Sequence, residues 1–194
     1  LEARESTAAR VIAETGAAMI PPYNHPNVIA GQGTIALELL DECPQLDAII
    51  VPLGGGGLIS GIALAAKALK PSIRIIGAEP ELAGDAAASK REGSIQPAMK
   101  PLTIADGLRT SLGPLTFPVV RDLVDEVVLV SEEEILASMR LMWERMKLTI
   151  EPSAAVGVAV ACSAWMRARQ NAGIEDAGVV LCGGNVDLAA LRWA

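Results

Sequence analysis

The chain has 194 residues, of which 51% are hydrophobic and only 3% are aromatic, and it carries a formal net charge of −7. This length is enough to bury one sizeable core, and no uninterrupted apolar run reaches the roughly 20 residues that span a bilayer. The acidic balance argues against nucleic acid or an anionic membrane surface as the partner, and so few aromatic residues offer little for base stacking.

Helix-like and strand-like segments alternate along the chain. The patterns predict helices over residues 5–14, 33–40, 58–69, 131–147 and 152–169, and strands over residues 16–20, 47–52, 73–79, 126–130 and 178–181. Ser131 and Glu134 have the spacing of a capping box, which indicates where the fourth helix begins. Residues 86–113 are polar and less regular. Strands that alternate with crossover helices predict an α/β fold, with an open, mostly parallel, twisted sheet and helices on both faces.

Four consecutive glycines, Gly54, Gly55, Gly56 and Gly57, separate the second predicted strand from the helix at 58–69. Side-chain-free residues at this junction leave backbone N–H groups pointing into one concavity beside the positive end of a helix dipole, where a phosphate monoester fits. The loop lacks the Lys-Ser/Thr of a P-loop and the G-x-G-x-x-G of a dinucleotide site. A flexible linker is the alternative, but linkers are polar, whereas both flanks here are strongly apolar.

Two further groups follow predicted strands, namely Glu79 and the segment at residues 182–185. In open α/β sheets, ligands bind beyond the carboxyl ends of the strands. The sequence therefore predicts that the glycine loop, Glu79 and residues 182–185 share one cleft.

Several strings occur in an order that carries a family resemblance: VPLGGGGL at 51–58, TIADG at 103–107, WERMK at 143–147, EPS at 151–153 and GGNVD at 183–187. They resemble the serine racemases and, more broadly, the threonine/serine dehydratases of the fold-type II pyridoxal-phosphate enzymes, over essentially the whole chain. The resemblance implies a homodimeric enzyme that racemises serine and also eliminates water from it. A plain threonine dehydratase is the alternative within the family.

The resemblance also assigns the cofactor contacts. It implies that the phosphate of pyridoxal 5'-phosphate binds the backbone amides of Gly54, Gly55, Gly56, Gly57 and Leu58. It places Cys182 opposite the pyridine nitrogen, where a neutral group leaves carbanion character near Cα, as racemisation and β-elimination need. Serine racemases are expected to carry Ser here, and a thiol is the weaker donor. The alternative for Cys182 is a small buried residue at a strand end.

A divalent cation is the second implied ligand. By resemblance, Glu79, the carbonyl of Ala83 and Asp85 hold Mg²⁺ or Ca²⁺, both of which prefer oxygen ligands. By spacing alone, these two acids would be ordinary solvated carboxylates.

ATP as an allosteric activator is the third implied ligand, and the resemblance assigns it to Lys147 and Asn185. The alternative for Lys147 is a cation favoured by the dipole at a helix C-terminus.

The Schiff-base lysine of the family has no match in the chain. Lys67, Lys70, Lys90 and Lys100 lie in sequence contexts that differ from the family segment. We therefore expect this lysine and the opposite-face serine to lie upstream. On this interpretation, residues 1–20 end a small domain, residues 21–194 form a large cofactor-binding domain without its N-terminal part, and the isolated chain is inactive. A non-catalytic phosphate- or nucleotide-binding module is the alternative from a different functional class.

The cysteine content bears on the compartment. Cys43, Cys162 and Cys182 have no metal-like spacing, and their odd number does not suggest a disulfide framework. We therefore expect a reducing, cytoplasmic location.

Overall fold

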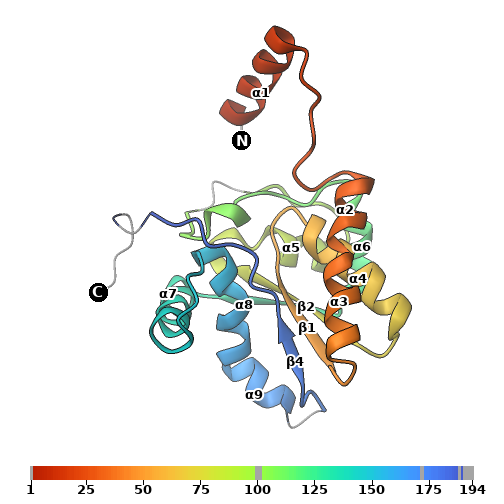
Figure 1. Ribbon diagram of the computed structural model, residues 1–194, viewed down its shortest axis with the longest axis vertical. Helices are drawn as coiled ribbons and strands as arrows, with labels where there is room; N and C mark the ends of the chain where they lie inside the picture. Colours follow the sequence, from red (N-terminus) through yellow and green to blue (C-terminus); the bar gives the residue numbers. More distant parts are fainter. Residues whose placement is uncertain (1, 99–101, 171–172, 188, 190–194) are drawn as a thin grey trace.

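A four-stranded parallel sheet lies at the centre of the computed structural model, which describes residues 2–98, 102–170, 173–187 and 189 (Figure 1). Its order is β3–β2–β1–β4, with β1 at Ala48–Pro52, β2 at Arg74–Pro80, β3 at Glu126–Val130 and β4 at Ala177–Val179. All three pairings are parallel, and Ile50 of β1 pairs with Ile76 on one side and Val179 on the other. The predicted open parallel sheet is confirmed.

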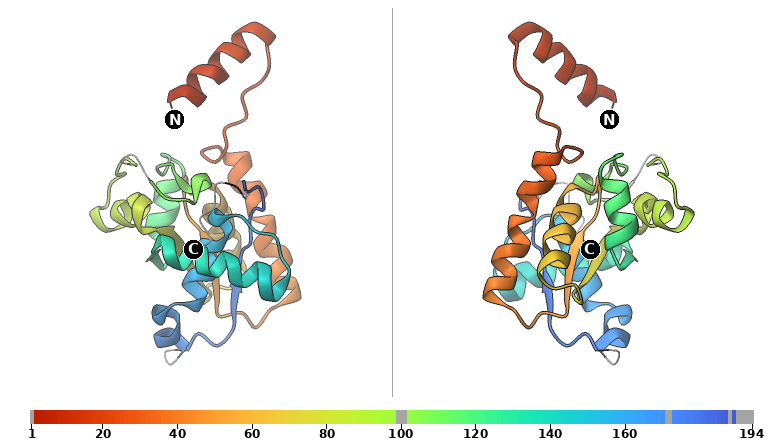
Figure 2. Two further views of the ribbon diagram at one scale, coloured as in Figure 1. Left: turned by 90° about the vertical axis from the view of Figure 1, so that its left-hand side faces the viewer. Right: turned by 90° about the vertical axis from the view of Figure 1, so that its right-hand side faces the viewer.

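Helices cover both faces of the sheet (Figures 1 and 2). Ile49 and Val51 pack on one face, against α3 (Thr34–Glu42) and α4 (Gly57–Leu69). Ile50 packs on the other face, with α7 (Glu132–Leu141) and α8 (Pro152–Cys162). Because successive strand residues point to opposite faces, the unbroken apolar run of β1 fills two cores at once.

The remaining helices are shorter or lie at the edges of the fold. They are α1 (Glu2–Thr15), α2 (Pro26–Gln32), α5 (Asp85–Glu92), α6 (Thr116–Leu123) and α9 (Ala164–Gln170). None of the helices in the described parts of the chain is long and apolar enough to cross a bilayer.

The strand expected at residues 16–20 is wrong. These residues have no regular structure, are all exposed, and belong to the arm that joins α1 to the body of the molecule (Figure 1). A strand is stable only beside a partner, and the arm leads away from the sheet.

Three helices were not expected from the sequence, namely α2, α5 and α6, and α5 lies within the stretch interpreted as irregular. They have only 7, 8 and 8 residues. Helices this short are marginal by themselves and form here because they pack on the sheet or on α4.

Two predicted helices are interrupted. The helix expected at 152–169 breaks at Ser163, whose extended backbone ends α8. The Ser163 hydroxyl donates to the carbonyl of Val160 at 2.6 Å and accepts the N–H of Met166 at 3.2 Å. The helix expected at 131–147 begins at the predicted capping box but is a regular α-helix only to Leu141, and a π-turn at Met142–Met146 follows.

Candidate functional site

The glycine loop lies at the carboxyl end of β1 and turns into α4, and all four glycines are buried. Gly56 is the N-cap of α4 with a left-handed backbone (φ +85°), and no side chain caps this helix. The first N–H groups of a helix have no intrahelical acceptor. They are therefore available to an anion at the positive end of α4.

Close neighbours explain why the loop consists of glycine. A Cβ added at Gly55 would lie 2.5 Å from Cγ of Tyr23, and one at Gly57 would lie 2.7 Å from Cβ of Tyr23. At Gly56, an added Cβ would lie 2.9 Å from Cβ of Thr116. Any other residue at these three positions would have to displace packed atoms.

A cavity of about 340 Å³ opens over this loop, within the range of small-molecule sites. Cys182 also lines it, so the structure brings together the loop, Leu58 and the segment that follows the last strand. The lining also contains residues to which the sequence assigned no role, namely Arg4, Tyr23, Thr110, Glu151 and Ser153. Glu151 and Ser153 belong to the EPS string at 151–153, so the family resemblance could have identified them as site residues. Nothing in the sequence pointed to Tyr23, because the residues that its side chain contacts at this site are distant in the chain.

Glu151 organises the segment that contains Cys182. Its carboxylate accepts the N–H of Asn185 at 2.9 Å, and its own N–H donates to the carbonyl of Gly183 at 3.0 Å. Although Cys182 is exposed by area, loss of hydration at its thiol, followed by the negative charge of Glu151, raises the pKa of the thiol to about 11. Cys182 is therefore a neutral thiol at physiological pH.

The second candidate site lies where β2 meets the start of α5. Glu79 is 1% exposed, and its carboxylate accepts the N–H groups of Ala86 at 2.8 Å and Ala87 at 2.9 Å. Asp85 is 7% exposed, and neither of its carboxylate oxygens has a hydrogen-bond partner in the described parts of the chain. Burial raises the pKa of Glu79 to about 8 and that of Asp85 to about 6. Two desolvated carboxylates, one of them without partners, are a donor set that fits a hard divalent cation.

The expected single cleft is wrong. Ala83 and Asp85 line a separate hollow of about 800 Å³, which shares no lining residue with the cavity over the glycine loop. Both sites lie at the carboxyl edge of the sheet, as predicted. They are separate because the short turn Glu81–Ala83 and α5 fold over the end of β2, and the Glu79 carboxylate is directed to the N-terminus of α5.

Lys147 and Asn185 are both exposed. Lys147 ends the π-turn in a left-handed conformation (φ 59°), and its ammonium donates to the carbonyl of Glu144 at 2.8 Å. Asn185 lies beside Glu151 instead. The nucleotide assignment to this pair stays a prediction.

The lysines have other structural roles. Lys67 forms an ion pair of 2.9 Å with Asp125, and the ammonium groups of Lys70 and Lys90 donate to backbone carbonyls. None of these three lines the cavity over the glycine loop. Lys100 lies outside the described residues.

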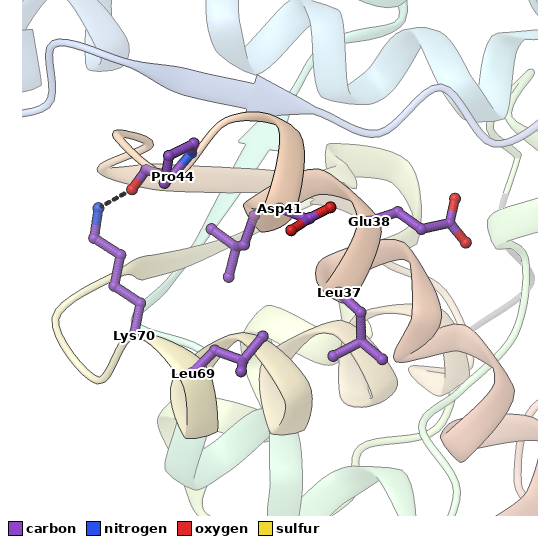
Figure 3. Close-up of a pocket in the computed structure, with 7 residues that line it drawn as sticks. Leu37, Glu38, Asp41, Pro44, Leu69 and Lys70 are labelled. Atoms are coloured by element: carbon purple, nitrogen blue, oxygen red, sulfur yellow. Dashed lines mark hydrogen bonds between the residues drawn. The ribbon is translucent and has the colours of Figure 1, made fainter.

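A further hollow lies between α3 and the end of α4. Figure 3 shows Leu37 and Leu69 facing one another across it, with Lys70 bonded to the carbonyl of Pro44 at 3.0 Å. The loop containing Pro44 leads into the amino end of β1, at the edge opposite the glycine loop. The residues that line this hollow form no set of groups suited to catalysis.

The comparisons with known proteins agree with this geometry. The model of the pyridoxal-phosphate dependent enzyme family matches residues 1–183. Serine racemase of Arabidopsis thaliana is 54% identical over 192 residues, which cover 98% of this chain and 58% of that protein. L-threo-3-hydroxyaspartate ammonia-lyase of Saccharomyces cerevisiae is 49% identical over 188 residues, with coverages of 96% and 56%. The structure of maize serine racemase superposes with a TM-score of 0.91 at 50% identity, and the match covers 96% of this chain and 57% of that one.

The chain thus spans 56% to 58% of the length of these relatives. The family model, by contrast, matches nearly the whole of this chain. We conclude that the chain belongs to the pyridoxal-phosphate dependent enzyme family.

Proposed function

We propose that the chain supplies the phosphate-binding part of a pyridoxal-phosphate dependent serine racemase that also eliminates water from serine. The observation that carries this proposal is the glycine loop, which lines one cavity together with Cys182. The serine racemase and ammonia-lyase relatives support the pairing of the two activities. Because the chain spans less than two thirds of those relatives, the activity is proposed for the whole protein that carries it.

Bound pyridoxal phosphate supplies an electron sink for negative charge that develops at Cα of an amino acid. The residues of this chain hold and tune the site. The amides of the glycine loop would hold the phosphate, and Cys182, as a neutral thiol, would offer the ring nitrogen a weak hydrogen bond without transferring a proton to it. Arg4 adds a cation to the lining of a cavity that receives a dianion.

We further propose that Glu79, the carbonyl of Ala83 and Asp85 hold Mg²⁺ or Ca²⁺. The buried oxygens of Asp85, which have no hydrogen-bond partner among the described residues, support this assignment, because an uncompensated buried carboxylate is costly unless a cation or a proton neutralises it. The cation would tie the end of β2 to the start of α5.

The remaining proposals concern assembly and location. We propose ATP as an activator at Lys147 and Asn185 and a homodimer that uses the nearby surface, which the exposed side chains of Met146 and Leu148 support. Three free cysteines support a reducing, cytoplasmic location. The exposed arm at residues 16–20 supports a domain boundary near residue 20, with residues 21–194 in the cofactor-binding domain.

Turnover by the whole protein tests the function. With pyridoxal phosphate and Mg²⁺ added, L-serine should yield D-serine on chiral chromatography and pyruvate in a keto-acid assay. Release of 2-oxobutyrate from threonine with no D-serine would support the threonine dehydratase alternative. A protein that binds the cofactor but turns over neither amino acid would contradict the proposal.

A further inference from the structure

Tyr23, the one tyrosine of the chain, lies lengthwise along the glycine loop. A Cβ added at Gly57 would lie 2.7 Å from Cβ of Tyr23 and 2.8 Å from its Cα. At Gly55, the corresponding position is 2.5 Å from Cγ and from Cδ1 of its ring. The backbone of Tyr23 therefore contacts one end of the loop, and its ring covers the middle.

The hydroxyl end of the ring is also anchored. The hydroxyl of Thr110, which is 9% exposed, donates to the hydroxyl of Tyr23 at 2.9 Å. Cγ2 of Thr110 lies 3.4 Å from the position of a Cβ at Gly54, so this contact reaches the first glycine of the loop. Asn24, which follows Tyr23 in the chain, accepts the N–H of Leu115 at 2.9 Å through its side-chain oxygen. Tyr23 is thus held at its hydroxyl and, through Asn24, next to its backbone.

Four glycines in a row would be a flexible segment without such support. Glycine loses more conformational freedom on folding than any other residue. An anion that had to order the loop would bind more weakly by the cost of ordering, whereas a loop that is already ordered binds without this cost. A tyrosine ring suits the task, because it presents a large rigid surface and has only two side-chain torsions.

We propose that Tyr23 is a positioning residue for the cofactor phosphate, which holds Gly55 and Gly57 so that the loop amides converge before the phosphate arrives. This inference rests on the proposed function of the loop. Tyr23 acts through the loop backbone, and Thr110 acts through Tyr23.

Binding of two probes by the whole protein tests the inference. Pyridoxal phosphate and pyridoxal differ only in the phosphate group, so the ratio of their dissociation constants isolates the contribution of the loop. Tyr23→Leu removes the ring, and Tyr23→Phe keeps the ring but removes the hydroxyl. Trp165→Leu is the matched control, because Trp165 is also a half-buried aromatic residue but donates to Glu126 at 3.1 Å, at the amino end of β3.

We expect Tyr23→Leu to weaken pyridoxal phosphate binding by roughly tenfold, equal to about 1.4 kcal/mol, with little change for pyridoxal. Tyr23→Phe should remain closer to the wild type than Tyr23→Leu, and Trp165→Leu should lower thermal stability without changing the ratio. If Tyr23→Leu does not fold, Thr110→Val provides the same test, with a smaller loss that is again specific to pyridoxal phosphate.

Two results would overturn the inference alone, given a wild type that binds pyridoxal phosphate. One is an unchanged ratio in Tyr23→Leu, or in Thr110→Val where Tyr23→Leu does not fold. The other is an equal loss for pyridoxal and pyridoxal phosphate, as a merely structural role would give. A wild-type protein that binds no pyridoxal phosphate would overturn the proposed function, and this inference with it.

Discussion

The hydroxyl of Thr116 donates a hydrogen bond of 2.7 Å to the carbonyl of Gly55. Thr116 is fully buried, and its hydroxyl also accepts the N–H of Gly113 at 2.9 Å. The C=O of Gly55 and the N–H of Gly56 belong to one trans peptide plane and point in opposite directions. A carbonyl held toward Thr116 therefore turns the N–H of Gly56 away from α6.

The first prediction concerns Gly56. Gly56→Asp should abolish retention of pyridoxal phosphate, because the new side chain would meet Leu112 and Thr116 and place a negative charge where a dianion must approach. Gly93→Asp is the matched control, since Gly93 also has a left-handed backbone (φ +70°) but open space around its Cβ position. The measurement is the visible absorbance of bound cofactor after desalting. Full retention by Gly56→Asp would show that the phosphate binds elsewhere.

The second prediction concerns the divalent cation. A ligand that binds only the folded state stabilises it, by about 2.7 kcal/mol at a free concentration of roughly 100 times Kd. Mg²⁺ or Ca²⁺ should therefore raise the melting temperature of the protein, and the double variant Glu79→Gln/Asp85→Asn should lose this response. Glu81→Gln, which changes an exposed carboxylate at the rim of the same hollow, should keep it. A metal response that survives in the double variant would place the cation at another site.

The third prediction concerns the contact between α2 and α4. A Cβ added at Gly61 would overlap the carbonyl of Ile29 and lie 2.6 Å from the backbone nitrogen of Gly33. Gly61→Ala should destabilise the protein by about 1–3 kcal/mol or more, because backbone atoms cannot move aside as a flexible side chain can. Gly31→Ala, on the exposed side of α2 with nothing within 4 Å, should be neutral or stabilising by up to about 1 kcal/mol. Urea unfolding of both variants checks this, and similar midpoints would contradict the close helix contact.

The fourth prediction concerns acid stability. Backbone N–H groups of Asp176, at 3.0 Å, and of Glu175, at 2.9 Å, donate to the carboxylate of Asp47 and lower its pKa below the usual value. A lowered pKa in the folded state means that the stabilisation is present above the unfolded-state pKa and is lost as the pH falls through the folded-state pKa.

The wild type should therefore lose stability more steeply than Asp47→Asn as the pH falls from about 5 to about 2, because the unfolded-state carboxyl gains its proton before the folded-state one does. Urea midpoints across this range measure the difference. If the urea midpoint of the variant falls as steeply with decreasing pH as that of the wild type, the hydrogen bonds of Asp47 do not contribute to acid stability.

Local features of the fold could be predicted because their causes are local. The apolar run at 48–53 suits a strand buried on both faces, and the capping box of Ser131 and Glu134 involves residues three positions apart. The glycine loop was recognisable for the same reason, since a strand, four glycines and a helix are contiguous. Its position at the sheet edge followed from the general topology of parallel sheets.

Other features depended on contacts between segments distant in the chain. Residues 16–20 have the composition of a strand but no neighbouring strand to bond with. By spacing alone Asp85 is an ordinary solvated acid, yet packing around the start of α5 leaves its oxygens buried and, within the described parts of the chain, without hydrogen-bond partners. Tyr23 contacts glycines more than thirty positions later and a threonine 87 positions later. No pattern of neighbouring residues could reveal such contacts, because the folding of the whole chain brings these atoms together.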